Sequence, residues 1–418
     1  FSMMTGRFPH ELIAHWQDAL DDTHPTLAEV LGAAGYVSGG FVANMEYAGY
    51  ESGLHRGFVN FEDYPVSAAE LALSSSLAHA VINNQALRNL TGEHQILGRK
   101  LAEDVNRNFL DWLSRQDPER PFFAFLNYFD AHSIYLPPDP WDAEFGSEAE
   151  RDMTGTWHFK RRARHRLKDR TATPAQIQVE LDSYDGSIAY VDHEVGRLLD
   201  ELERRRILDD TIVVVTADHG EHFGEHDRFG HDNSLYRQLV QVPLVIRFPA
   251  RAPAGAIVSE PVSLRDLPAT LLDLAGLGRG GIGGASLASL WGETVPAETS
   301  RTIMSEWAAG SLTPRGLEAN PGRLEHALDF LRVKLGMEAA EKRELEVLMK
   351  SLVADDHHYI RNGDGTEELY HFGSDPAEVQ DLARSGQADT HLVRFRTSLR
   401  RILAPHLPST SNPEVSFR

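Results

Sequence analysis

Two strand-length runs of apolar residues constrain the fold more than any other feature of this sequence. Residues Pro121–Leu126 and Thr211–Thr216 are almost continuously apolar rather than alternating, which is typical of strands covered on both faces. Val242–Arg247 is a third run of the same kind. Because such strands need helices above and below their sheet, the runs predict an α/β/α sandwich.

Helical patterns fall between these runs, as that fold class requires. Thr26–Glu29 fits a helix capping box, and the helix that it begins ends at Gly35, before a predicted strand over Tyr36–Ala43. Ser263–Leu274 reads as another packed helix. Further apolar residues recur at helical spacing, at Ile188, Val191, Val195, Leu198, Leu199 and Leu202. Strand and helix therefore alternate, which predicts a mainly parallel mixed sheet.

The length of the chain, 418 residues, exceeds what one small core organises. A glycine-rich stretch over 278–284 is a plausible linker. We therefore expect a main domain over 1–285 and a smaller C-terminal α+β part over 286–418. Two segments look inserted, a charged and irregular one near 139–175 and a helical one near 308–352 that is dense in Glu, Lys and Leu.

Composition excludes several classes of partner and site. The chain has 41 basic and 62 acidic residues, a net charge of -21, which disfavours nucleic acid and anionic membrane surfaces. No apolar run is long enough to span a membrane, so a soluble chain is expected. The absence of cysteine excludes disulfides, zinc-thiolate sites and a thiol nucleophile within these residues. The compartment stays open between cytoplasmic and periplasmic or secreted, because no signal peptide is readable at Phe1.

The strongest local signal for chemistry is Asp218 with His219, directly after the strand that ends at Thr216. Ligands of open α/β sheets collect beyond the carboxyl ends of strands, and a carboxylate beside an imidazole can coordinate a divalent cation. The two residues are therefore metal candidates. The alternative is a turn in which Asp218 caps backbone groups and His219 hydrogen-bonds to the main chain.

Four blocks in order resemble the second signature region of the type I sulfatases of the alkaline phosphatase superfamily: Tyr190–Leu199, Asp210–Glu221, Gly230–His231 and Val242–Arg247. Ser2–His10 is similar to the tail of the first signature, in a register that places the nucleophile five residues before Phe1. Asn127–Tyr135 resembles a strand-end histidine motif, and Glu368–Pro376 resembles the C-terminal signature.

The resemblance implies a formylglycine, or a serine or threonine, that attacks sulfur or phosphorus. It also implies one divalent cation, with Ca²⁺ expected first and Mn²⁺ or Mg²⁺ as alternatives, which activates the nucleophile and stabilises the anionic oxygens. Asp218 and His219 match part of the family's metal shell. Two adjacent aspartates of that shell have no match among these residues.

Three further residues match positions of the family motifs. His132 lies where a histidine contacts the transferred group or helps to release the alkoxide, a task that suits an imidazole titrating near neutrality. His231 stands where many relatives have a lysine facing the leaving-group oxygen. Both could instead be hydrogen-bonded structural histidines. Asn44 stands where many sulfatases have a Gly-Lys-Trp-His motif, and it is either a neutral donor to substrate or a strand-end cap.

The leading prediction is a metal-dependent sulfatase-like hydrolase that cleaves a small anionic sulfate ester, and a homo-oligomer is compatible with it. A phosphodiesterase or phosphonate monoester hydrolase is favoured by His219, since many sulfatases have asparagine there. The missing Lys-Trp-His motif favours a catalytically silent, sulfatase-shaped binding protein. Lys160–Arg170, the only dense basic run, is either a solvated helix face or a flap that recognises anionic substrate.

Overall fold

A computed structural model describes most of the chain: residues 1–12, 19–45, 47–63, 100–133, 135–146, 173–231, 234–291, 301–308, 348–385 and 389–404. The basic run over 160–170 and most of both predicted inserts lie outside the described residues.

Parallel strands form the centre of the first part of the chain. Strand β1 (Val37–Val42) pairs in parallel with β2 (Asn60–Glu62) on one side and with β3 (Phe122–Asn127) on the other. A second ladder is antiparallel and joins β4 (Val213–Thr216) to β7 (Leu244–Arg247). The predicted combination of parallel and antiparallel pairing is confirmed.

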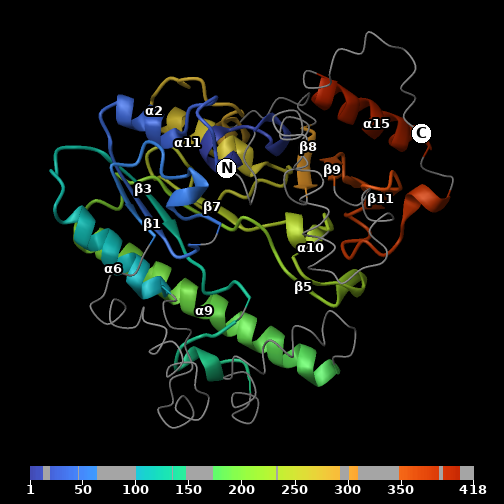
Figure 1. Ribbon diagram of the computed structural model, residues 1–418, viewed down its shortest axis with the longest axis horizontal. Coiled ribbons are helices and arrows are strands. Elements are labelled where there is room, and N and C mark those ends of the chain that lie inside the picture. Colours follow the sequence, from blue (N-terminus) through green and yellow to red (C-terminus); the bar gives the residue numbers. More distant parts are fainter. Residues whose placement is uncertain are drawn as a thin grey trace.

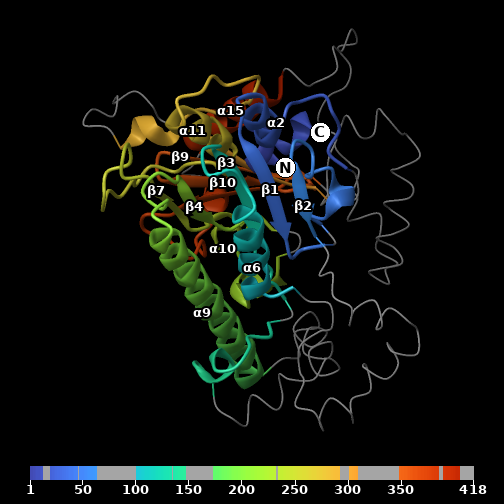
Figure 2. The ribbon, with the colours of Figure 1, turned by 90° about the vertical axis from the view of Figure 1, so that its left-hand side faces the viewer.

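Helices cover both faces of the parallel strands (Figure 1). On one face lie α6 (Ala102–Leu113) and α9 (Pro174–Arg204), which Figure 2 shows side by side. On the other face lie α2 (Leu27–Ala33) and α11 (Leu267–Leu274). Within β3, Phe122 packs toward α6 and α9, whereas the next residue, Phe123, packs toward α2 and α11. The continuously apolar run of β3 is thus explained, and the α/β/α sandwich is confirmed. The expected cover on both faces is not found for the other two runs, since Val215 of β4 and Val245 of β7 are 39% and 60% exposed.

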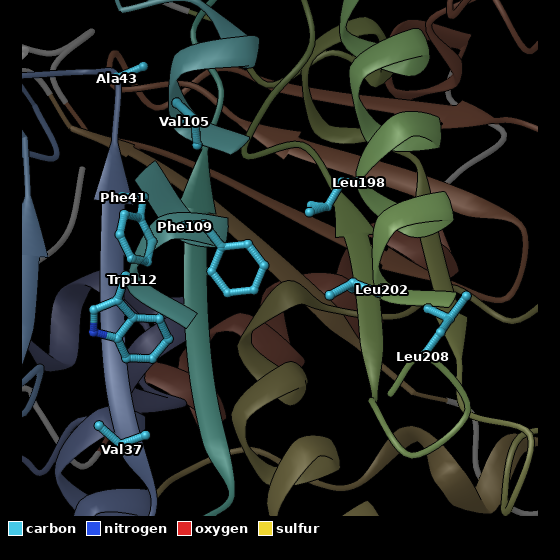
Figure 3. Packing of buried hydrophobic residues seen from close by; sticks show 9 residues of the cluster. All are labelled: Val37, Phe41, Ala43, Val105, Phe109, Trp112, Leu198, Leu202 and Leu208. Carbon is cyan, nitrogen blue, oxygen red and sulfur yellow. The ribbon is translucent and has the colours of Figure 1, made fainter. Parts of the chain in front are cut away.

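A well-buried part of the core lies between β1 and α6 (Figure 3). Phe41 of β1 has no exposed surface, and its ring meets Phe109 and Trp112 of α6 edge-on, each at a centroid distance of 5.7 Å. Leu198 and Leu202 of α9 close the same cluster. The predicted helical face is confirmed at these two leucines but not at Ile188, which is 42% exposed.

The predicted helix start at Thr26 is also found, and glycine ends the first helix. Thr26 and Glu29 form the capping box of α2. The short α1 (Ser2–Thr5) ends at Gly6, whose φ of 68° is left-handed. A Cβ at Gly6 would lie 2.3 Å from the carbonyl oxygen of Gly283, so the two backbones need glycine to approach so closely. The glycine-rich stretch over 278–284 is therefore packed against α1 at this point.

The last part of the chain forms an antiparallel sheet in the order β11-β10-β9-β8. Its strands are β8 (Ile303–Ala308), β9 (Leu348–Ala354), β10 (His357–Arg361) and β11 (Glu367–His371). Helix α15 (Asp389–Leu403) packs its buried residues, such as Phe395, on one face. The other face contacts α10 (Arg237–Val240) and the residues before it, which lie between the two parts of the molecule in Figure 1.

One predicted boundary is wrong. The helical insert was expected to reach residue 352, but Leu348–Ala354 is strand β9. Its backbone pairs with β8 on one side and β10 on the other. Leu352 packs toward α15 and Met349 toward α10, so residues on both faces of the strand are buried and no helical stripe forms.

Smaller elements complete the described residues. A hairpin of β5 (His222–Phe223) and β6 (Phe229–Gly230) projects after β4. Short 3-10 turns cover Pro9–Glu11, Tyr50–Ser52, Trp141–Ala143, Glu225–Asp227, Leu264–Asp266, Leu287–Leu290 and Leu382–Ser385. Within the described ranges, we find no helix with the length and apolar character that crossing a membrane demands.

Candidate active site

Three histidines from separate loops meet beyond the strands. His132 follows β3, His219 follows β4 and His231 follows β6. The rings of His219 and His231 are stacked with centroids 4.4 Å apart, and those of His132 and His231 lie 5.0 Å apart. Three predicted site residues therefore form one cluster.

Each ring is held through its Nδ1 atom. Nδ1 of His132 donates to the carbonyl oxygen of Ser133 at 2.7 Å, and Nδ1 of His219 donates to that of Gly220 at 2.9 Å. Nδ1 of His231 lies 3.1 Å from a carboxylate oxygen of Glu221. A neutral imidazole that donates through Nδ1 keeps its lone pair on Nε2. The cluster is thus arranged to use its Nε2 atoms.

Asp218 and His219 have the donor atoms that a divalent cation requires. Oδ2 of Asp218 lies 3.8 Å from Nε2 of His219, and the side chains are 68% and 38% exposed. Oδ1 of Asp218 also accepts from the backbone N–H of His219 at 3.1 Å, so part of the turn interpretation holds as well. A hard carboxylate oxygen with an imidazole lone pair fits half of a metal shell. No set of three or more His, Cys, Asp or Glu side chains among the described residues completes one.

The start of α1 lies close to these metal candidates. The backbone nitrogen of Phe1 lies within electrostatic reach of Asp218.

His132 is held neutral by its surroundings. Burial is the main cause that lowers its pKa, to about 4, and the charge of His231 adds to the effect. The hydrogen bond to Ser133 acts in the opposite direction, and the ring stacks on Phe129 at 4.2 Å. The sequence-based expectation that His132 has a pKa near neutrality is therefore wrong for this environment. At pH 7 the ring is a neutral proton acceptor.

Glu221 is the residue that sequence reasoning missed. Its side chain is only 5% exposed, and its carboxylate accepts from the hydroxyl of Tyr135 at 2.7 Å as well as facing His231. Burial tends to raise the pKa of Glu221, but the hydrogen bond and charge of His231 bring it below its ordinary value. The only sequence signal was its place at the end of the run that begins at Thr216.

Asn44 makes the contacts of a strand-end cap. Its Oδ1 accepts from the backbone N–H of Tyr47 at 3.1 Å, and its own backbone N–H donates to Oδ1 of Asn127 at 2.9 Å. These bonds close the turn after β1. Its substrate-binding role stays a prediction.

The segment after His231 is anchored on the C-terminal sheet, which the sequence did not predict. The hydroxyl of Tyr236 donates to Glu368 of β11 at 2.8 Å. The backbone N–H of Arg237 donates to Glu378 at 2.8 Å, and Glu378 also binds Nδ1 of buried His358 at 2.6 Å. The C-terminal part therefore anchors Tyr236 and Arg237, which follow His231 in the chain.

Comparison with known proteins agrees with this architecture. The profile of the sulfatase family matches residues 1–277. The chain belongs to the sulfatase family. It is 31% identical to an arylsulfatase of Clostridium perfringens over 175 residues, which are 40% of this chain and 36% of that enzyme. It is 32% identical to an N-acetylglucosamine-6-O-sulfatase of Bacteroides thetaiotaomicron over 140 residues, 33% of this chain and 23% of the relative.

The fold extends beyond the matched sequence. The structure of a phosphonate monoester hydrolase of Agrobacterium radiobacter superimposes with a TM-score of 0.67 at 19% identity, over 97% of this chain and 85% of that one. The two sulfatases just described are matched over about a third of their length or less. Membership of the sulfatase family and its fold are thus established for this chain.

Proposed function

We propose that this protein hydrolyses a sulfate ester at the histidine cluster, and that Asp218 and His219 contribute ligands to one divalent cation. The observation that carries the proposal is the convergence of His132, His219 and His231 beside Asp218, in a chain of the sulfatase family. The arylsulfatase and N-acetylglucosamine-6-O-sulfatase relatives support a sulfate ester as the substrate class.

The cation, with Ca²⁺ proposed first, would act as a Lewis acid on the ester oxygens and favour the ionised nucleophile. The family resemblance implies that this nucleophile is formylglycine, or else serine or threonine. Residues that precede Phe1 would enter the site near Asp218, because the backbone nitrogen of Phe1 lies within electrostatic reach of that carboxylate.

The chain's own histidines divide the proton transfers. His132 is neutral at pH 7 and offers Nε2 as a proton acceptor, because burial holds its pKa at about 4. His231 is bonded to a buried carboxylate, which stabilises positive charge on its ring. It is therefore the group suited to neutralise the negative charge that grows on the leaving oxygen.

Turnover of three ester classes tests the proposal. The complete protein, supplied with Ca²⁺, Mn²⁺ or Mg²⁺, would be assayed with 4-nitrophenyl sulfate, a bis-aryl phosphate diester and an aryl phosphonate monoester. We expect kcat/KM to be highest for the sulfate. A protein that binds sulfate esters but turns over none of the three classes would instead be a silent, sulfatase-shaped binding protein.

Phosphonate monoester or phosphodiester hydrolysis is the second candidate. His219 favours it, because the family resemblance implies asparagine at this position in many sulfatases and histidine in relatives that act on phosphonate or phosphate esters. A kcat/KM for the phosphonate or diester that exceeds the value for the sulfate would select it.

A further inference from the structure

We propose that Glu221, held by Tyr135, is a positioning residue that sets the orientation of His231 and so directs its Nε2 toward the leaving group. The inference rests on the proposed function for its kinetic consequence, while the orientation itself is a property of the folded chain. Glu221 does not need to touch the substrate to act in this way.

The contacts of Glu221 allow one arrangement of the His231 ring. Its carboxylate oxygens lie 3.1 and 3.2 Å from Nδ1 of His231. An ionised carboxylate can only accept hydrogen bonds, so Nδ1 must carry the proton that points to it. The opposite ring atom, Nε2, is then turned away from Glu221. In histidines generally, a hydrogen bond at one ring nitrogen determines which form the other nitrogen takes.

Tyr135 fixes the carboxylate in turn. Its hydroxyl donates to Oε2 of Glu221 at 2.7 Å, and the tyrosine is itself 4% exposed. The ring packs against Tyr184 at 5.1 Å and Phe223 at 5.8 Å. Burial and the neighbouring Glu221 charge raise the pKa of Tyr135 far above its ordinary value, so its hydroxyl keeps the proton that it donates. The carboxylate therefore has little freedom to rotate.

The reaction shows where this orientation matters. As the nucleophile's oxygen bonds to sulfur, the bond from sulfur to the leaving oxygen breaks, and its electron pair goes to that oxygen. When the ring of His231 is a cation, with a proton on each nitrogen, it can transfer the Nε2 proton to this oxygen and become neutral. An alkoxide needs this proton, whereas 4-nitrophenolate is stable without it. Misorientation of His231 should thus slow alkyl sulfates far more than 4-nitrophenyl sulfate.

Glu221→Leu, Glu221→Gln and Tyr135→Phe test the proposal, with Glu225→Gln as the matched control from the same hairpin. Glu225 accepts from the backbone N–H of Phe223. We expect Glu221→Leu to lower kcat/KM for an alkyl sulfate by roughly 10- to 100-fold, a part of what a general acid contributes. The loss on 4-nitrophenyl sulfate should be several-fold smaller. Glu221→Gln keeps an acceptor oxygen for Nδ1 but loses the negative charge that stabilises the cationic ring, so it should recover only part of the alkyl sulfate activity.

Nitrogen-15 NMR of histidine-labelled protein at one fixed pH gives a readout independent of turnover. We expect a downfield Nδ1 proton of His231, assigned with His231→Asn, that Glu221→Leu abolishes and Glu225→Gln retains. Its persistence in Glu221→Leu, or equal losses on both sulfates, would overturn the proposal. If Glu221→Leu does not fold, Tyr135→Phe should weaken the same signal. If the wild type turns over no sulfate, the proposed function fails while the NMR result still decides the role of Glu221.

Discussion

Glu306 offers a sharp test of how the two parts of the chain are joined. Its carboxylate is 4% exposed on β8 and binds both the backbone N–H of His10 at 3.1 Å and its Nδ1 at 2.8 Å. Lys350, opposite on β9, donates to the other oxygen. Burial alone would raise the pKa of Glu306, but the hydrogen bond from His10 and the charge of Lys350 hold it at about 2.

Glu306→Gln keeps the volume and removes the charge, which leaves Lys350 facing a neutral amide. Breaking a buried ion pair lowers the free energy of unfolding by about 3–5 kcal/mol. For a chain of this length, that corresponds to a fall of roughly 3–6 °C in Tm. Glu201 on α9 is the matched control. Hydrogen bonds from Arg204 and Arg205 hold its pKa at about 2 as well, but its side chain is 23% exposed. Because solvent screens exposed pairs, Glu201→Gln should cost less than about 1 kcal/mol.

Urea unfolding at pH 7 would measure both variants. The folded pKa of Glu306 lies below the ordinary value of 4.5, so its stabilisation is present above pH 4.5 and is lost as pH falls toward 2. The difference between wild type and Glu306→Gln should therefore shrink between pH 4.5 and pH 2. Equal effects of the two glutamines at pH 7 would refute the reasoning that burial decides the cost.

Three further predictions concern the core, acid stability and the anchor. Phe41→Ala should lower the free energy of unfolding by about 3–5 kcal/mol in urea titration, since Phe41 has no exposed surface. Burial lowers the pKa of His222 to about 4, so the free energy of unfolding of the wild type should fall as pH decreases from 6.5 to 4. The His222→Gln variant should lose less unfolding free energy over the same pH range. Tyr236→Phe should cost about 1.5–3 kcal/mol in unfolding free energy because Glu368 loses a donor. An unchanged value for any of the three would contradict the corresponding contact.

The fold was predictable where local chemistry agrees with packing. Continuous apolar runs identified β3, β4 and β7. Helices pack on both faces of β3, whereas Val215 of β4 and Val245 of β7 are 39% and 60% exposed. The capping box at Thr26 marked the start of α2 for the same local reason. Strand β9 was mistaken for helix, since one of its two pairing partners, β8, lies about 50 residues earlier and the charged residues before β9 look helical.

The site was predictable in part. The positions of His132, His219 and His231 after strands suggested that they meet, and the ring distances show that they do. The low pKa of His132 could not be read from sequence, because it depends on burial and on the neighbouring His231. The contacts of Glu221 and the anchoring of Tyr236 depend on residues up to 132 positions apart, which no local pattern reveals.

The central claim is that Asp218 and His219 hold a functional cation. Calorimetric titration of Ca²⁺ into the complete, chelator-treated protein, with 4-nitrophenyl sulfate turnover followed in parallel, tests it most directly. We predict one bound cation per chain that restores activity, and loss of both in Asp218→Ala combined with His219→Ala. Full activity after chelation, or unchanged Ca²⁺ binding in that double variant, would contradict the account.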